Sequence, residues 1–204
     1  MTQTIKAIFF DFGNVLLEWN PRYVYRRYFP NDEAAMEQFL QEVNFMEWNA
    51  QQDKGRTFEE GVAVLSQEFP HYAELIQAYH DNWRDSIGGS LTGTVEILKR
   101  LKKAGYSIYG LSNWSAETFP IARENYDFFG LMDDIVLSGE VGEIKPDPEI
   151  FEIALERIGR PANECLFIDD SLPNIEQARK MGFAVVHFES PEQLERELQR
   201  LGLL

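Results

Sequence analysis

Short runs of apolar residues, separated by segments with helical periodicity, form the pattern of this chain. The first run, residues 5–10, is rich in Ile and Phe and is interrupted only by Lys6. A run of this length predicts a strand that is buried on both faces. Asp11 ends the run, and Gly13 and Asn14 follow, which tolerate the left-handed backbone of a sharp turn. The pattern therefore places a carboxylate at the carboxyl end of a buried strand, where open α/β sheets bind ligands.

The next stretch, from residue 20 to about residue 85, has apolar residues at helical spacing and no strand pattern. Pro21 suits a first helical position, and Asn31 can cap a second helix. Thr57 and Glu60 form the capping box of a later helix. Aromatic residues are frequent in these segments, which predicts a compact helical insert with a core of its own.

Beyond residue 90, helical and strand patterns alternate. Helices are expected around residues 95–105, 115–127, 147–159 and 171–182 and from residue 190, and strands in the segments YSIYGL, DIVLS, CLFID and FAVVHF. Strands separated by helices predict a parallel sheet with right-handed crossovers. We therefore expect an α/β fold: a Rossmann-like parallel-sheet core from residues 1–17 and 86–204, with an inserted α-helical cap at residues 18–85.

Composition narrows the class of protein. The 204 residues are 44% hydrophobic and 26% charged, which is ordinary for a globular protein. No apolar run reaches the ~18 residues of a membrane span, and residues 1–4 do not resemble a signal peptide, so a cytoplasmic protein is expected. The formal net charge of −15 disfavours nucleic acid and anionic membranes as partners. A small anionic substrate is compatible with this charge if a metal ion or nearby basic residues offset the negative electrostatic potential of the protein.

Polar residues follow the ends of the predicted core strands or precede a core helix. They are Asp11, Ser112, Asn113, Lys145, Asp169 and Asp170. Because parallel strands end at the same edge, one cleft would receive all of them. Crowded acids repel one another unless a cation is present, and carboxylate oxygens suit Mg²⁺. Each residue also has a local alternative as a turn, a surface charge or a helix cap, but four such signals on one edge favour a site.

The segments FFDFGNVL, LSN, GEIKPDPEIF and CLFIDDSLPNI, in this order, resemble the motifs of the haloacid dehalogenase-like (HAD) hydrolase superfamily. The resemblance covers essentially the whole chain. It implies that Asp11 is a nucleophile that forms an aspartyl intermediate. It also implies that Ser112 and Asn113 bind phosphoryl oxygens, and that Lys145 steadies both the nucleophile and the phosphate.

The same resemblance implies a Mg²⁺ ion held by Asp11, the main-chain carbonyl of Gly13, Asp169 and Asp170, with Asp170 as the more direct ligand. The form D-x-G-N-V-L resembles a bacterial subgroup associated with glucose 1-phosphate hydrolysis. We therefore expect a Mg²⁺-dependent phosphatase for a small phosphorylated metabolite, with sugar phosphates as the finer expectation.

One position departs from the family phosphatases, which usually carry a second Asp two residues after the nucleophile. This chain has Gly13 there. Family dehalogenases also lack that Asp, so hydrolysis of a carbon–halogen bond is the alternative, although dehalogenases need no metal and usually lack the Asp169–Asp170 pair. A third possibility is a binding protein that retains the cleft. Gly13 predicts a steep dependence of rate on leaving-group acidity, unless Glu47 or Asp53 replaces the missing acid.

The cap is expected to select the substrate. By position, the candidates to face the cleft are Glu47, Trp48, Asn49, Asp53, Lys54 and Arg56. The alternative for each is a solvated helix surface. Gly88 and Gly89, where the cap rejoins the core, are expected to permit hinge motion.

Overall fold

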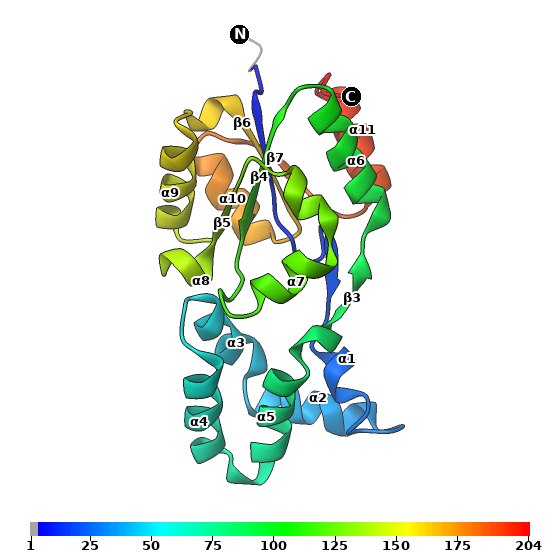
Figure 1. The fold of residues 1–204 in the computed structure, drawn as a ribbon, viewed down its shortest axis with the longest axis vertical. Helices are drawn as coiled ribbons and strands as arrows, with labels where there is room; N and C mark the ends of the chain where they lie inside the picture. Colours follow the sequence, from blue (N-terminus) through cyan, green and yellow to red (C-terminus); the bar gives the residue numbers. More distant parts are fainter. Residues whose placement is uncertain (1–3) are drawn as a thin grey trace.

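A five-stranded parallel sheet forms the centre of the computed structural model, which describes residues 4–204 (Figure 1). Its strand order is β5-β4-β1-β6-β7. The strands are β1 (Ala7–Phe10), β4 (Ser107–Ser112), β5 (Asp134–Leu137), β6 (Cys165–Asp169) and β7 (Ala184–His187). The expected Rossmann-like sheet is confirmed, and residues 1–3 of the expected core lie outside the described residues.

Helices cover both faces of this sheet. They are α6 (Thr92–Lys103), α7 (Phe119–Asn125), α8 (Ser138–Val141), α9 (Pro148–Ile158), α10 (Leu172–Lys180) and α11 (Pro191–Arg200), with short 3₁₀ turns at Asp127–Leu131 and Ala162–Glu164. Alternate residues of β1 point to opposite faces, as the two-residue period of a strand requires. Ile8 packs in one cluster with residues of α6 and α11, whereas Phe9 packs in the other with residues of α9 and α10.

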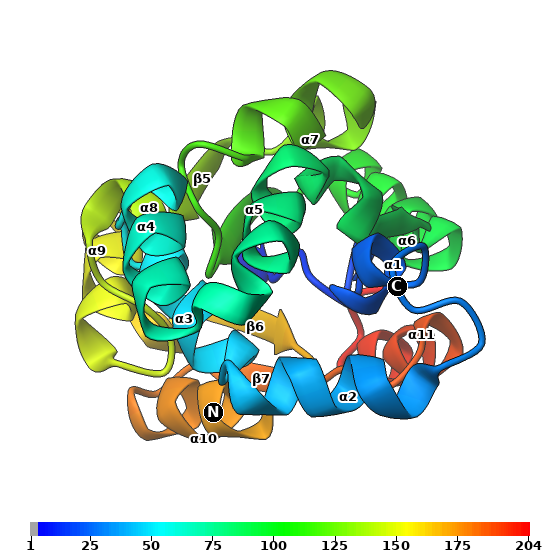
Figure 2. The same cartoon turned by 90° about the horizontal axis from the view of Figure 1, so that it is seen from below.

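The predicted cap contains a bundle of short helices that lies beyond the carboxyl edge of the sheet (Figures 1 and 2). These are α1 (Arg22–Tyr25), α2 (Glu33–Glu42), α3 (Phe45–Asp53), α4 (Phe58–Glu68) and α5 (Ala73–Asp81), with 3₁₀ turns at Pro70–Tyr72 and Trp83–Ser86. Tyr25, Phe45 and Tyr79 form edge-to-face and stacked ring contacts at its centre. The insert therefore has an aromatic core of its own, as the sequence predicts.

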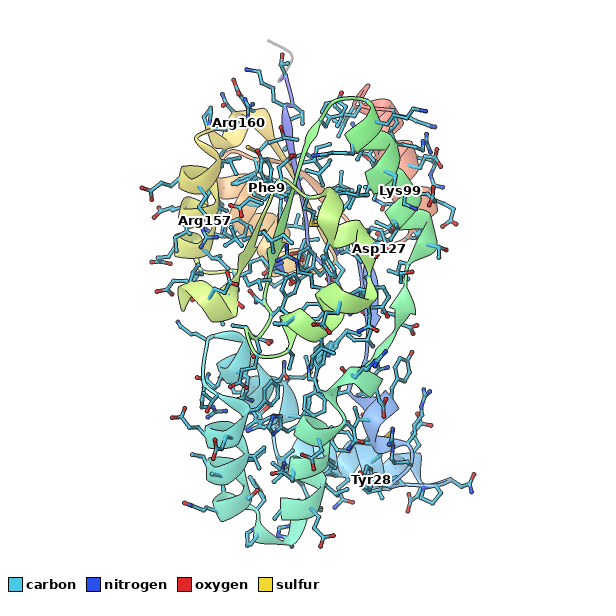
Figure 3. The ribbon with its side chains drawn as sticks, viewed as in Figure 1. Phe9, Tyr28, Lys99, Asp127, Arg157 and Arg160 are labelled. Atoms are coloured by element: carbon cyan, nitrogen blue, oxygen red, sulfur yellow. The ribbon has the colours of Figure 1, made fainter. Side chains whose placement is uncertain are left out.

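Side chains fill the space between the ribbons (Figure 3). Phe9, labelled there, is fully buried between the sheet and its helices, whereas Tyr28 lies on the outer surface of the helical bundle. The division of the chain at residues 17/18 and 85/86 stays a prediction. Among the described residues, no helix is long and apolar enough to cross a membrane.

Several local predictions need correction. Asp32, not Asn31, caps α2 by accepting a hydrogen bond from the Ala35 N–H, because Asn31 is in the left-handed region with φ 62°. A two-stranded antiparallel ribbon, β2 (Leu17–Trp19) and β3 (Ile87–Ser90), was not expected, since its strands are too short for a periodic signal. The predicted cap of α4 is confirmed: Thr57 Oγ1 accepts a hydrogen bond from the Glu60 N–H.

Candidate active site

The end of β1 places Asp11 at the carboxyl edge of the sheet. Its backbone N–H donates to the carbonyl of Ile168 at 2.9 Å, which continues the pairing of β1 with β6. The next residue, Phe12, is fully buried against Trp114 and other aromatic rings. This packing fixes the turn, and Asn14 takes the left-handed conformation, φ 55°, that the sequence predicts. The Asp11 carboxylate is thereby held at the sheet edge, and its side chain is only 12% exposed.

Two donors converge on the Asp11 carboxylate. The hydroxyl of Ser112, the last residue of β4, donates to Asp11 Oδ1 at 2.7 Å. The Nζ of Lys145 lies 2.9 Å from the same oxygen and also donates to Asp169 Oδ2 at 2.7 Å and to the carbonyl of Leu111 at 2.8 Å. Lys145 is not a surface charge: it is 3% exposed and links the ends of three strands.

Asn113 holds the backbone of Lys145. Its side-chain amide accepts from the Lys145 N–H at 2.8 Å and donates to the Lys145 carbonyl at 2.9 Å. The carbonyl and the NH₂ of the amide each have one partner in the Lys145 backbone. The role of Asn113 as a phosphate ligand stays a prediction, and a positioning role, which the sequence did not indicate, is added to it.

Burial and neighbouring charges have opposite effects on the pKa values of Asp11 and Lys145. Burial raises the pKa of Asp11 to about 6, although Lys145 and the Ser112 hydroxyl favour the carboxylate. Burial disfavours the Lys145 ammonium, but the carboxylates of Asp11 and Asp169 outweigh that effect and hold the pKa of Lys145 above its ordinary value. One ammonium is thus shared between two buried acids.

Asp169 and Asp170 follow β6 but have different environments. Asp169 is fully buried and accepts hydrogen bonds from Lys145, from the Asn174 amide and from the Ser171 N–H. Asp170 is only half-buried and lines the cleft. Burial and the nearby Asp169 charge raise the pKa of Asp170. Asp170 is therefore the more available of the two carboxylates, in line with the prediction that it is the more direct metal ligand.

The donor set fits a hard divalent cation. Asp11, Asp169 and Asp170 each present an oxygen, and these atoms lie within 4.8 Å of one another. Carboxylate oxygens are the ligands that Mg²⁺ prefers. Gly13, predicted to add its carbonyl, lines the same cleft. Its ligand role, like that of the three acids, stays a prediction.

The cleft at this edge has a volume of about 380 Å³. Asp11, Ser112, Lys145 and Asp170 line it from the core. Of the six residues expected from the cap, only Asn49 and Asp53 line it. Apolar side chains from both parts of the chain also line it: Trp19, Met46, Ala50, Trp83 and Trp114.

The remaining cap candidates lie elsewhere. Trp48 is wrong as a cleft residue: its indole is buried in the cap and donates to the carbonyl of Gly61 at 2.9 Å. Glu47 and Arg56 line a separate hollow on the cap. Lys54 pairs with Glu143 of the core at 3.5 Å. Selection by position along the chain missed Met46 and Ala50. Residues 46, 49, 50 and 53 share one face of α3, and this helical spacing is the signal that identifies its cleft residues.

Comparison with curated proteins gives two relatives that cover nearly the whole chain. The sesquiterpene phosphatase astK of Aspergillus oryzae is 28% identical over 188 residues, which are 92% of this chain and 91% of the relative. The drimenol cyclase drtB of Aspergillus calidoustus is 26% identical over 200 residues, 97% of this chain. The chain spans only 36% of the length of that second relative.

Among solved structures, a HAD family enzyme from Bacteroides thetaiotaomicron, in complex with magnesium and inorganic phosphate, has a TM-score of 0.68 and 26% identity. The alignment covers 91% of this chain and 95% of that one. The family model for haloacid dehalogenase-like hydrolases matches residues 5–182. With the parallel sheet and the acids at its edge, these matches confirm the resemblance, and the chain belongs to the haloacid dehalogenase-like hydrolase family.

Proposed function

We propose that this protein is a Mg²⁺-dependent phosphatase that hydrolyses small phosphorylated metabolites through an aspartyl-phosphate on Asp11. The observation that carries the proposal is the shared contact of Ser112 and Lys145 with Asp11, beside two further carboxylates that fit a magnesium ion. The sesquiterpene phosphatase relative and the magnesium and phosphate of the solved neighbour support it.

Each residue of the cleft has its own role in the proposed reaction. The Asp11 carboxylate attacks phosphorus, which splits hydrolysis into two easier steps. Lys145 and Ser112 orient Asp11 and offer positive charge and a donor to the phosphoryl oxygens. Asp11, Asp169, Asp170 and the Gly13 carbonyl would hold Mg²⁺, which when bound neutralises charge on the transferring group.

The organic part of the substrate has two candidate chemistries. Sugar phosphates, the finer expectation from the sequence, suit the polar groups of Asn49 and Asp53 in the cleft. The Trp19, Trp83 and Trp114 side chains favour a second class, phosphates of apolar or flat organic groups, which the sesquiterpene phosphatase relative also supports. A phosphate-release panel that contains sugar 1- and 6-phosphates, prenyl phosphates and aryl phosphates compares the two classes directly.

Asp11→Asn tests the nucleophile, because it keeps the shape and removes the charge. We expect turnover of p-nitrophenyl phosphate to fall by several orders of magnitude while the thermal midpoint stays near that of the wild type. Asp127→Asn, an exposed acid that does not line the cleft, is the matched control and should keep full activity. Retention of a tenth of wild-type turnover by Asp11→Asn would contradict the assignment.

The two alternatives give different readouts. A haloacid dehalogenase would release halide from 2-haloacids and keep its activity in excess chelator. A binding protein would release neither phosphate nor halide. The proposed phosphatase should lose phosphate release on chelation and regain it when Mg²⁺ is added.

A further inference from the structure

The core side of the cleft has no proton donor at the position two residues after Asp11. A Cβ built on Gly13 meets no atom within 4 Å, so open space stands where an acid would be. An alkoxide is a poor leaving group, and a positioned acid contributes roughly 10²- to 10⁴-fold to such steps. An efficient enzyme with this core therefore needs an acid from another element.

Asp53 is an acid that lines the same cleft from the cap. It is the last residue of α3. Its carboxyl accepts a hydrogen bond from the Asn49 amide at 2.9 Å. Its carbonyl accepts from the Ser138 hydroxyl of the core. These bonds hold Asp53 in one orientation where the cap meets the core.

The surroundings of Asp53 keep its proton in place. Burial raises its pKa to about 8, and the negative charge of Asp11 adds to the rise, although the Ser115 and Asn49 hydrogen bonds oppose it. The other charged side chains that line the cleft are Asp11, Lys145 and Asp170. The Lys54–Glu143 ion pair flanks Asp53 at the cap–core boundary. Asp53 is therefore mostly protonated at neutral pH, the form in which a carboxyl can act as an acid.

We propose that Asp53 is the general acid and base of the reaction, a role that rests on the phosphatase function proposed above. As Asp11 attacks phosphorus, the bond to the leaving oxygen breaks and its electron pair takes the proton of Asp53. The Asp53 carboxylate then accepts a proton from the water that attacks phosphorus, the Asp11–phosphorus bond breaks, and phosphate leaves. Both residues return to their starting states, so atoms and charge balance.

A leaving-group series tests the role. Asp53→Asn keeps the shape and cannot supply the proton. On alkyl phosphates such as glycerol phosphate, we expect kcat to fall by about 10²-fold or more. On p-nitrophenyl phosphate, whose leaving group needs no proton, the fall should stay within about fivefold. Glu47→Gln is the matched control, because Glu47 belongs to the same helix but lies outside the cleft. It should leave both activities unchanged.

Equal losses on alkyl and aryl phosphates in Asp53→Asn would overturn the proposal, since they indicate only a structural link between cap and core. Gly13→Asp provides a second test that leaves Asp53 intact and places the new side chain in open space. If an acid is already present, the added carboxyl should not raise alkyl phosphate turnover relative to aryl turnover. A gain of tenfold or more would show that the wild type lacks an acid. Absence of phosphate release from every ester would instead refute the phosphatase function.

Discussion

At the scale of single residues, Asp11 links protonation to catalysis. Burial raises its pKa to about 6, and in the proposed mechanism only the carboxylate form of Asp11 attacks phosphorus. Activity should therefore be lost as the pH falls through about 6 when Mg²⁺ is scarce. Saturating Mg²⁺ favours the carboxylate and should move this acidic limb to lower pH. The measurement is kcat/KM for p-nitrophenyl phosphate against pH at limiting and saturating Mg²⁺. An acidic limb at the same pH at both Mg²⁺ concentrations would contradict the prediction that Asp11 is a ligand of the metal.

The sequence predicts the acids and donors of this cleft because each follows a strand or precedes a core helix. Asp11 and Ser112 need only the parallel arrangement to meet, and the structure brings them within 2.7 Å. The sequence does not predict the contact of Asn113 with Lys145 or any role for Asn174. Asn113 binds the backbone of Lys145, 32 positions away, which only the tertiary fold brings near. Asn174 binds the carboxylate of Asp169 across the turn between β6 and α10, where the sequence pattern alone indicates only a helix start.

At the scale of elements, α3 shows why cap residues are hard to predict. One face, with Phe45 and Trp48, packs in the cap, and another, with Asn49 and Asp53, lines the cleft. Both faces are at least partly covered, so the contrast between polar and apolar faces that identifies a surface helix is weak. The sequence supplies the helix but not its orientation, which is why Trp48 was mistaken for a cleft residue.

The β2–β3 ribbon joins the helical bundle to the core and depends on a glycine. Gly89 has φ +138°, a conformation that L side chains rarely adopt. Gly89→Ala should lower the free energy of unfolding by about 1–3 kcal/mol through backbone strain. Gly130→Ala is the matched control, since Gly130 has open space and no positive φ. Urea denaturation of both variants measures the difference, and equal stabilities would contradict the strain argument.

At the scale of the whole molecule, contacts across the cleft hold the cap against the core. The Glu117 carboxylate accepts a hydrogen bond from the Phe58 N–H at the start of α4, at 2.9 Å. Ser138 and Glu143 of the core contact Asp53 and Lys54 at the end of α3. These contacts join residues 59 to 89 positions apart, so no local pattern in the sequence indicates them. The periodicity of apolar residues predicts the strands and helices of the core, but it does not predict how the cap packs against the core.

We predict that Mg²⁺ stabilises the folded protein, because three carboxylates crowd together in the cleft. An ion that binds only the folded state stabilises it by about 2.7 kcal/mol at 100 times its Kd, which is roughly 5–10 °C in the thermal midpoint of a chain of this size. We expect this rise for the wild type and a much smaller one for Asp170→Asn, whose side chain remains in place but loses its charge.

The Mg²⁺ measurement needs a control for nonspecific effects. The net charge is −15, and any cation screens repulsion among surface acids. NaCl at matched ionic strength measures that screening, and Asp127→Asn measures the loss of one exposed acid. Specific binding predicts that Mg²⁺ exceeds NaCl in the wild type and in Asp127→Asn, and that the excess shrinks in Asp170→Asn. Added inorganic phosphate should raise the midpoint further only where Mg²⁺ binds, since the same cleft holds Lys145 and Ser112 as donors. Equal rises of the thermal midpoint with Mg²⁺ in all three proteins would mean that Mg²⁺ only screens surface charge. They would contradict the prediction that Asp170 is a metal ligand.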